Sequence, residues 1–196
     1  MRAGRGRLGK LAAWAAGLVV GAAVLTGCPE GQLPSRIVSV AVLPADVAPY
    51  HQMTERVTGE YVTQAFASKT FRLVGSGSTT RLLAGPRNQD LYRRFKDQAK
   101  TSPEVALNIS QYLADVVNAQ GLVFPQLAVS QVGPYEGRVA LTISIFDRYT
   151  GQRIWRNRRE KSFVGQLGDP GFLKVVREMA VEIVAYVPEP PEEEVQ

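Results

Sequence analysis

Apolar residues recur along the middle of the chain with two periods, one typical of strands and one typical of helices. The run RIVSVAVLP at 36–44 is rich in β-branched residues and ends in proline, which predicts a buried strand. A second short strand, FRLVG, is predicted at 71–75. Strand, helix and strand in this order predict a parallel, right-handed crossover. The intervening helix face, with apolar residues three and four apart, is Met53, Val57, Tyr61, Val62, Ala65 and Phe66.

Two further helices are predicted before the next strand. Residues 88–100 have the pattern of a polar, basic helix with little to bury. In TSPE, at 101–104, Thr101 or Ser102 suits an N-cap and Glu104 can close a capping box. The second helix is therefore expected to begin there. Its apolar face is Val105, Ile109, Tyr112, Leu113, Val116 and Val117.

Three strands and a last helix complete the pattern. The strands are predicted at about 121–131, 138–147 and 152–164. Gly151, in the turn between the last two, can adopt the positive φ of a bulged hairpin. Asp169 and Pro170 open the last helix, and Pro188 ends it.

These elements, in the order β-α-β-(α)-α-β-β-β-α, predict an α/β fold. We expect a single-domain sandwich over 36–187, in which helices pack against a mixed sheet of about five strands. The remaining end, PEPPEEEVQ at 188–196, is rich in proline and glutamate, and we expect it to be a disordered acidic tail.

The residues before Cys28 have the layout of an export signal. Four basic residues and no acid stand in 1–10, and an uncharged, mostly apolar run of 17 residues follows at 11–27. That run is shorter than the ~20 residues that a membrane-spanning helix needs. Leu25, Thr26, Gly27 and Cys28 resemble the bacterial lipobox, Leu-x-Gly-Cys. The resemblance implies that 1–27 are a lipoprotein signal peptide and that Cys28 carries covalent lipid after cleavage.

A lipid on Cys28 would hold the protein to a membrane through a tether at 28–35. One acyl chain binds only marginally, at about 0.8 kcal/mol for each buried CH₂, so several chains are needed for permanent attachment. Many lipoproteins retained at the inner membrane carry aspartate after the cysteine, and here Pro29 stands there. The resemblance thus implies the outer membrane, facing the periplasm. The alternative is an uncleaved anchor in which Cys28 is an ordinary residue.

Removal of 1–27 changes the charge of the protein. The full chain has 23 basic and 18 acidic residues, and the signal peptide holds four of the basic ones, so 19 remain against 18. This balance gives no global case for nucleic-acid binding. Cys28 is the only cysteine, so the mature chain has no disulfide and must be stabilised by its core.

No stretch of the sequence carries a strong catalytic or metal-binding motif. The glycine-rich GSGSTTR at 75–81 lacks the lysine of a P-loop, and we expect a flexible connection there. His51 is the only histidine and no G-x-S-x-G elbow is present, so we expect a protein without metal, cofactor or catalytic site. A hydrolase with an unrecognised site remains a lesser alternative. Its acids would be Asp46, Asp115, Asp147 and Asp169.

The most distinctive polar feature is the strand RIWRNRREK at 153–161. The candidate binding residues are Arg153, Trp155, Arg156, Arg158, Arg159 and Lys161. Strict alternation would place the odd positions on one face and Arg156, Arg158 and Glu160 on the other. Such a strand suits an acidic partner, a glycan or anionic lipid headgroups. The plainer interpretation is an edge strand that charge protects from aggregation.

Taken together, these segments look like the α/β domain of a group of bacterial lipoproteins. The group includes the curli-secretion lipoprotein and the lipoprotein activator of penicillin-binding proteins. The most distinctive shared part is the hairpin with Asp147, Thr150, Gly151 and Trp155. A similar turn occurs in quinoprotein propeller blades, but there it is repeated, and here it occurs once. The long amphipathic hairpins of the curli-secretion pore have no counterpart here, so we infer no pore.

The resemblance implies a non-catalytic binding or assembly protein that uses no cofactor. We therefore expect an adaptor at the cell envelope that is held by lipid and binds another protein. The main alternative is an envelope-maintenance factor that binds glycan or anionic lipid through the basic strand at 153–161.

Overall fold

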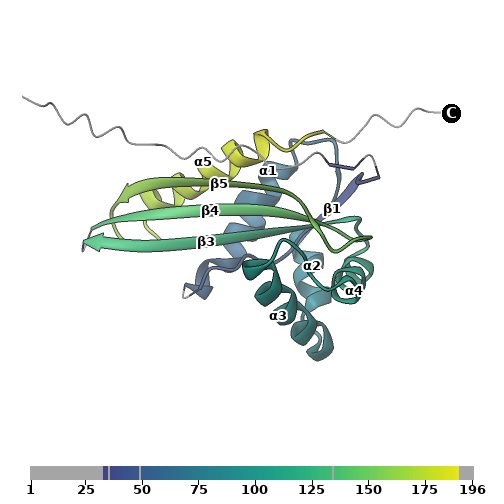
Figure 1. Ribbon diagram of the computed structural model, residues 1–196. Coiled ribbons are helices and arrows are strands. Elements are labelled where there is room, and N and C mark those ends of the chain that lie inside the picture. Colours follow the sequence, from purple (N-terminus) through teal and green to yellow (C-terminus); the bar gives the residue numbers. More distant parts are fainter. Residues whose placement is uncertain (1–32, 35, 49, 134, 190–196) are drawn as a thin grey trace, which may run out of the picture.

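The structure, a computed structural model, describes residues 33–34, 36–48, 50–133 and 135–189 (Figure 1). Within these ranges, five strands form one mixed sheet in the order β2-β1-β3-β4-β5. The strands are β1 (Ser39–Val42), β2 (Arg72–Val74), β3 (Gly121–Gly133), β4 (Glu136–Asp147) and β5 (Arg153–Val164). Because β1 pairs in parallel with both β2 and β3, and β3, β4 and β5 pair antiparallel, the predicted α/β class and mixed sheet are confirmed.

Helices cover both faces of this sheet. The helical elements are η1 (His51–Met53), η2 (Arg56–Thr63, a π-helix), α1 (Gln64–Phe66), α2 (Ser76–Leu83), α3 (Pro86–Thr101), α4 (Leu107–Val117) and α5 (Pro170–Ala185). In Figure 1, η2, α1 and α5 lie behind the sheet, whereas α2, α3 and α4 lie on its other side near one end. Within the described ranges no helix is long and apolar enough to cross a membrane.

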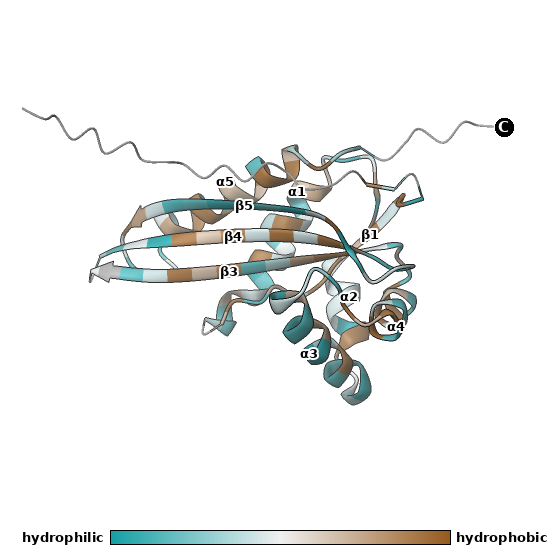
Figure 2. Cartoon of the chain, in the orientation of Figure 1, coloured by the Kyte–Doolittle hydropathy of each residue, from teal (hydrophilic) through white to brown (hydrophobic). Residues whose placement is uncertain are grey.

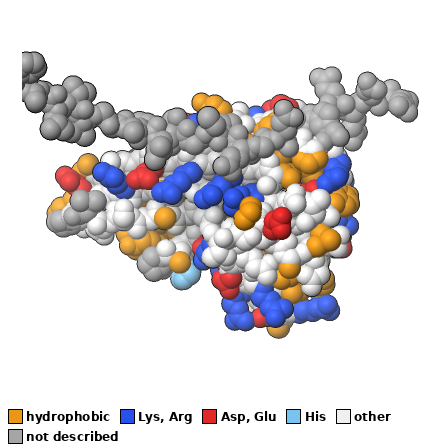
Figure 3. All heavy atoms as spheres, in the orientation of Figure 1, with side chains coloured by type: hydrophobic (Ala, Val, Ile, Leu, Met, Phe, Trp, Pro, Cys, Tyr) orange, Lys and Arg blue, Asp and Glu red, His pale blue; other side chains and the backbone are white. Residues whose placement is uncertain are grey.

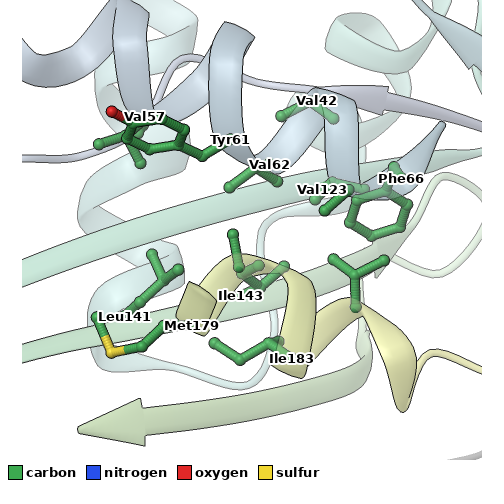
Figure 4. Close-up of a cluster of buried hydrophobic side chains, with 14 of the residues drawn as sticks. Val42, Val57, Tyr61, Val62, Phe66, Val123, Leu141, Ile143, Met179 and Ile183 are labelled. Atoms are coloured by element: carbon green, nitrogen blue, oxygen red, sulfur yellow. The ribbon is translucent and has the colours of Figure 1, made fainter. Parts of the chain in front are cut away.

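Two hydrophobic cores result, one on each face of the sheet. On the first, Val62 of η2 and Met179 and Ile183 of α5 pack toward Ile143 of β4 (Figure 4). On the second, Phe95 of α3 packs edge-on against sheet residues, as expected for a buried aromatic ring. Figure 2 shows that the rest of α3 is largely hydrophilic, which confirms the predicted polar helix with little to bury.

The predicted start of the helix after residue 101 is wrong. Thr101 is the last residue of α3, and α4 begins only at Leu107. Residues 103–105 are instead extended against the β4–β5 turn: the Val105 N–H donates to Gly151 O at 2.9 Å, and the Arg153 N–H donates to Pro103 O at 2.7 Å. Because the segment forms these hydrogen bonds with a distant turn, the local capping signal does not decide its conformation.

The prediction of a flexible connection at 75–81 is also wrong, because Ser76–Leu83 form α2. Gly75 precedes the helix and its carbonyl accepts the Thr79 N–H at 3.0 Å. Thr79 and Leu83, four residues apart on one helix face, are both buried. A polar threonine in the buried position conceals the helix period from a search for apolar spacing.

The C-terminal end of the described chain folds back on the loop before β2. The Glu189 carboxylate accepts the Thr70 N–H at 3.2 Å and the Thr70 hydroxyl at 2.8 Å, and it lies 3.1 Å from Lys69 Nζ. The hydrogen bond from the Thr70 backbone has the largest effect in lowering the pKa of Glu189, and the bond from the Thr70 hydroxyl lowers it further. Residues 188 and 189 of the predicted tail are thus described, and 190–196 lie outside the described residues, as do Cys28 and the signal peptide.

Candidate functional site: the open face of β3, β4 and β5

Alternation along the long strands separates a buried face from a polar one. In β4, Val139, Leu141, Ile143 and Ile145 face the core formed with η2 and α5, as predicted. The residues between them point to the opposite side, where α2, α3 and α4 cover only the end of the sheet near β1 (Figure 1).

We call the part of this side that lies beyond α2, α3 and α4 the open face. Cross-strand register places its rows opposite one another: Ser130 beside Arg138 and Ser162, Ala128 beside Ala140 and Glu160, Gln126 beside Thr142 and Arg158, and Ser144 beside Arg156. Thr142 and Ser144 are themselves buried. The open face therefore has small or uncharged residues on β3 and most of β4, and its charged side chains are Arg138 on β4 and Arg156, Arg158 and Glu160 on β5.

Positive charge dominates this surface. Arg158 Nη2 lies 3.0 Å from Glu160 Oε2, and Arg138 Nη1 lies 4.0 Å from Glu160 Oε1. Among the described residues, Arg156 has no carboxylate partner. Arg138 and Arg158 thus share Glu160. Figure 3 shows Lys and Arg side chains in a row over β5, beside a region of uncharged side chains.

The structure divides the predicted binding residues between the two sides of β5. Arg156 and Arg158 lie on the open face. Arg159, on the other side, places its guanidinium carbon 5.1 Å from the centre of the Tyr186 ring. Lys161 Nζ binds Glu182 at 2.6 Å on the same side. Trp155 is 1% exposed, so it is a core residue and not a binding residue.

Arg153 departs from the predicted alternation. A bulge between Ile145 and Phe146 places Arg153 opposite Phe146, while Trp155 stays opposite Ile145. Because directly opposed residues share a face, Arg153 and Trp155 face opposite sides of the sheet, and the sequence-based grouping of the two is wrong.

The contributions of β3 and β4 to this surface do not follow from the pattern of the sequence. Only the hairpin register shows that Thr142 lies opposite Arg158 and that Arg138, four residues before Thr142 on β4, reaches the same Glu160. The available signal was the turn with Gly151, whose position fixes that register. The predicted edge position of β5 is confirmed, because it ends the order of strands among the described residues.

The acids of the alternative hydrolase are dispersed and each has a structural partner. Asp46 binds Lys100 at 2.6 Å, Asp115 pairs with Arg148, and Asp147 pairs with Arg36. Asp169 accepts the Gln166 N–H at 2.8 Å. Within the described ranges no three His, Cys, Asp or Glu side chains are grouped as metal ligands.

Among the described residues, neither the main cleft nor the raised pKa of Tyr92 indicates a catalytic centre. A cleft of about 740 Å³ between η2 and α2 contains the exposed Arg56–Glu60 ion pair, 3.6 Å apart, but neither His51 nor an aspartate. Burial, and then the charge of Asp46, raise the pKa of Tyr92 well above its ordinary value. The Tyr92 hydroxyl donates to the Pro44 carbonyl, so this buried side chain has a structural partner.

No protein-family model matches this chain, and no curated protein matches its sequence. Solved structures do match. The PelC dodecamer from Paraburkholderia phytofirmans gives a TM-score of 0.50 at 12% identity, over 81% of this chain and 93% of that one. A single-residue variant of that dodecamer gives a TM-score of 0.51 at 10% identity, over 83% of this chain and 96% of that one. Lipoprotein GNA1162 from Neisseria meningitidis gives a TM-score of 0.45 at 11% identity, over 76% of this chain and 98% of that one.

At these identities the two PelC matches concern the fold alone. They agree with the predicted α/β architecture, and a protein named as a lipoprotein stands among the matches. The lipobox at Cys28 and the resemblance to the curli-secretion and penicillin-binding-protein-activator group remain predictions. The chain has the same fold as the PelC subunit.

Proposed function

We propose that this protein is a lipid-anchored adaptor of the bacterial cell envelope that binds a protein partner through its open face. The observation that carries the proposal is the excess of positive charge on one surface of the sheet, where Arg138 and Arg158 share Glu160 and Arg156 has no carboxylate partner among the described residues. An excess of arginine donors on a preorganised surface suits acidic groups of a partner, because it favours encounter and orientation. The protein acts by binding and uses no cofactor.

A double charge reversal tests the proposed surface. We expect Arg156→Glu with Arg158→Glu to reduce the partner recovered with the full-length protein from membranes by about tenfold. Two lost charge contacts of about 0.5–1 kcal/mol each amount to roughly that factor. The partner is identified by mass spectrometry and its amount is compared with wild type.

The matched control reverses two charges on α5, Lys174→Glu and Arg177→Glu. Lys174 lies 3.9 Å from Glu178, and Arg177 lies over the Tyr61 ring at 5.7 Å, so both belong to the opposite side of the sheet. Equal recovery with the two double variants would contradict the assignment of the open face.

The proposed anchor is tested at Cys28. We predict that Cys28→Ser leaves the chain without lipid, because serine offers no thiol for the diacylglyceryl group. Metabolic labelling with radioactive palmitate should mark the wild-type protein and not the variant. Label on the variant would contradict the proposal that Cys28 is the lipid attachment site.

A second candidate function is binding of glycan or anionic lipid through the same arginines. The unpaired state of Arg156 among the described residues favours it, because free guanidinium donors also bind phosphate. Retention of the wild-type protein, and not of the reversed variant, by vesicles or isolated cell-wall sacculi would support this candidate over a protein partner.

The dodecameric state of PelC suggests a specific protein partner, a second copy of this chain. Sedimentation of the full-length lipidated protein in detergent tests that possibility. An assembly that dissociates on reversal of Arg156 and Arg158 would make the open face a contact between copies. A monomer at all concentrations would leave a different protein as the partner.

A further inference from the structure

An exposed tyrosine lies between two arginines where β4 ends and the turn to β5 begins. Tyr149 is 44% exposed. The guanidinium carbons of Arg36 and Arg148 lie 5.2 Å and 5.5 Å from the centre of its ring. The contacts fix the ring on the surface, because cations within about 6 Å of an aromatic ring attract it.

An exposed leucine adjoins this turn. Leu107, the first residue of α4, is 43% exposed. A Cβ added to Gly151, in the turn, would lie 3.4 Å from the Leu107 Cα. The charges here are balanced, since Arg36 pairs with the buried Asp147 and Arg148 pairs with Asp115. The surface therefore combines apolar groups with arginines that keep further donors free, without a net charge.

The proposed lipid attachment point lies close to this surface along the chain. Arg36 is the eighth residue after Cys28, and eight extended residues span at most ~29 Å. Tyr135 marks the other end of the sheet, next to the first residue of β4. The 12 residues of β4 span ~40 Å. The tether thus holds the Tyr149 end within ~29 Å of the anchor, and the Tyr135 end lies a further strand length away from it.

We propose that Arg36, Leu107, Arg148 and Tyr149 form a surface that rests on the headgroup region of the phospholipid bilayer. This inference depends on the proposed lipidation of Cys28. Tyrosine and leucine enter the boundary between headgroups and acyl chains, and arginine donates to lipid phosphates. The long strands then point away from the bilayer, and the open face stays accessible to a partner in the periplasm.

Site-directed thiol labelling tests this orientation. Cys28 is the only cysteine and would be blocked by lipid, so Tyr149→Cys or Tyr135→Cys supplies one reactive thiol for a fluorophore. Tyr135 is 59% exposed and serves as the matched control at the far end. The full-length lipidated variants are inserted into vesicles of phosphatidylethanolamine and phosphatidylglycerol that contain brominated lipid quenchers.

We expect quenching at 149 to exceed that at 135 by at least about threefold, because interfacial groups lie only ~5–10 Å deep and position 135 is far outside. A fluorophore at Leu107→Cys should be quenched to the same extent as one at position 149. This second variant keeps the test valid if one of the two fails to fold. Equal quenching at 149 and 135, or stronger quenching at 135, would overturn the orientation while leaving the anchor intact. A chain without palmitate would overturn the anchor, and with it this inference.

Discussion

At the scale of single residues, the Asp-x-x-Thr-Gly hairpin is explained by the turn that it builds. The buried Asp147 carboxylate accepts the Tyr149 N–H at 2.9 Å and the Thr150 hydroxyl at 3.1 Å, and it pairs with Arg36. Gly151 follows with φ of +70°, and its carbonyl accepts the Val105 N–H. The motif therefore stabilises the fold and fixes the register that assembles the open face.

Alanine at Gly151 should destabilise the protein strongly. The new Cβ would lie 2.3 Å from the Val105 carbonyl oxygen, in addition to the strain of a positive φ. We predict a loss of about 3 kcal/mol or more in the free energy of unfolding, measured by urea denaturation. Gly168, with φ of +90° and no neighbour within 4 Å, is the matched control for strain alone. Its alanine variant should lose only about 1–2 kcal/mol. Equal losses would contradict the steric role of Val105.

At the scale of elements, the inner face of β5, which packs against α5, contains a buried polar side chain without a hydrogen-bond partner among the described residues. Asn157 is 3% exposed and lies opposite Ile143, yet neither its amide oxygen nor its nitrogen has a hydrogen-bond partner among the described residues. A buried amide without partners is unfavourable by about 1–3 kcal/mol. The strand therefore contains a polar residue that weakens the packing of its inner face.

Replacement of that amide should stabilise the protein. We predict that Asn157→Val raises the free energy of unfolding by about 1 kcal/mol, because valine suits a strand and needs no partner. Asn157→Asp, which buries a charge at the same place, should lower it. Urea denaturation measures both. A valine variant less stable than wild type would show that the amide has a role that its environment does not reveal.

Contact of the C-terminal end with the loop before β2 should depend on pH. Because the pKa of Glu189 is lowered in the folded state, its ionised form favours this contact. The contribution is fully present above the ordinary pKa of 4.5 and is lost as pH falls below it through the lowered value. NMR titration of the Thr70 amide should report this loss, and Glu189→Gln should abolish the titration. An unchanged titration in the glutamine variant would contradict the contact.

Local patterns predicted the elements whose side chains alternate regularly, such as β4 and α5, whose expected bounds lie within a few residues of those found. These local patterns gave the wrong conformation where contacts with distant residues, or a buried polar side chain, determine the structure. Residues 103–105 pair with the β4–β5 turn, and Thr79 hides the helix period of α2. The candidate site was predicted in part, because Arg156 and Arg158 follow from alternation. The bulge that places Arg153 on the side opposite Trp155, and the contribution of Arg138 from β4, require the sheet itself.

At the scale of the whole molecule, the sheet has two ends and two faces with different roles. One face is buried under η2 and α5, and the other leaves the arginines of β4 and β5 exposed. The end with Tyr149 lies near the proposed anchor, and the end with Tyr135 lies a strand length away. A partner would therefore meet the open face from the side, with its position set by the membrane.

In-cell photo-crosslinking tests the central claim, that the open face binds a partner. A photo-reactive residue replaces Arg158, whose side chain is 54% exposed, or Val181 on α5, which is 56% exposed, in the full-length chain. The account predicts one discrete protein adduct, identified by mass spectrometry, from position 158 and not from 181. An adduct from 181 alone, or the same adducts from both positions, would contradict it.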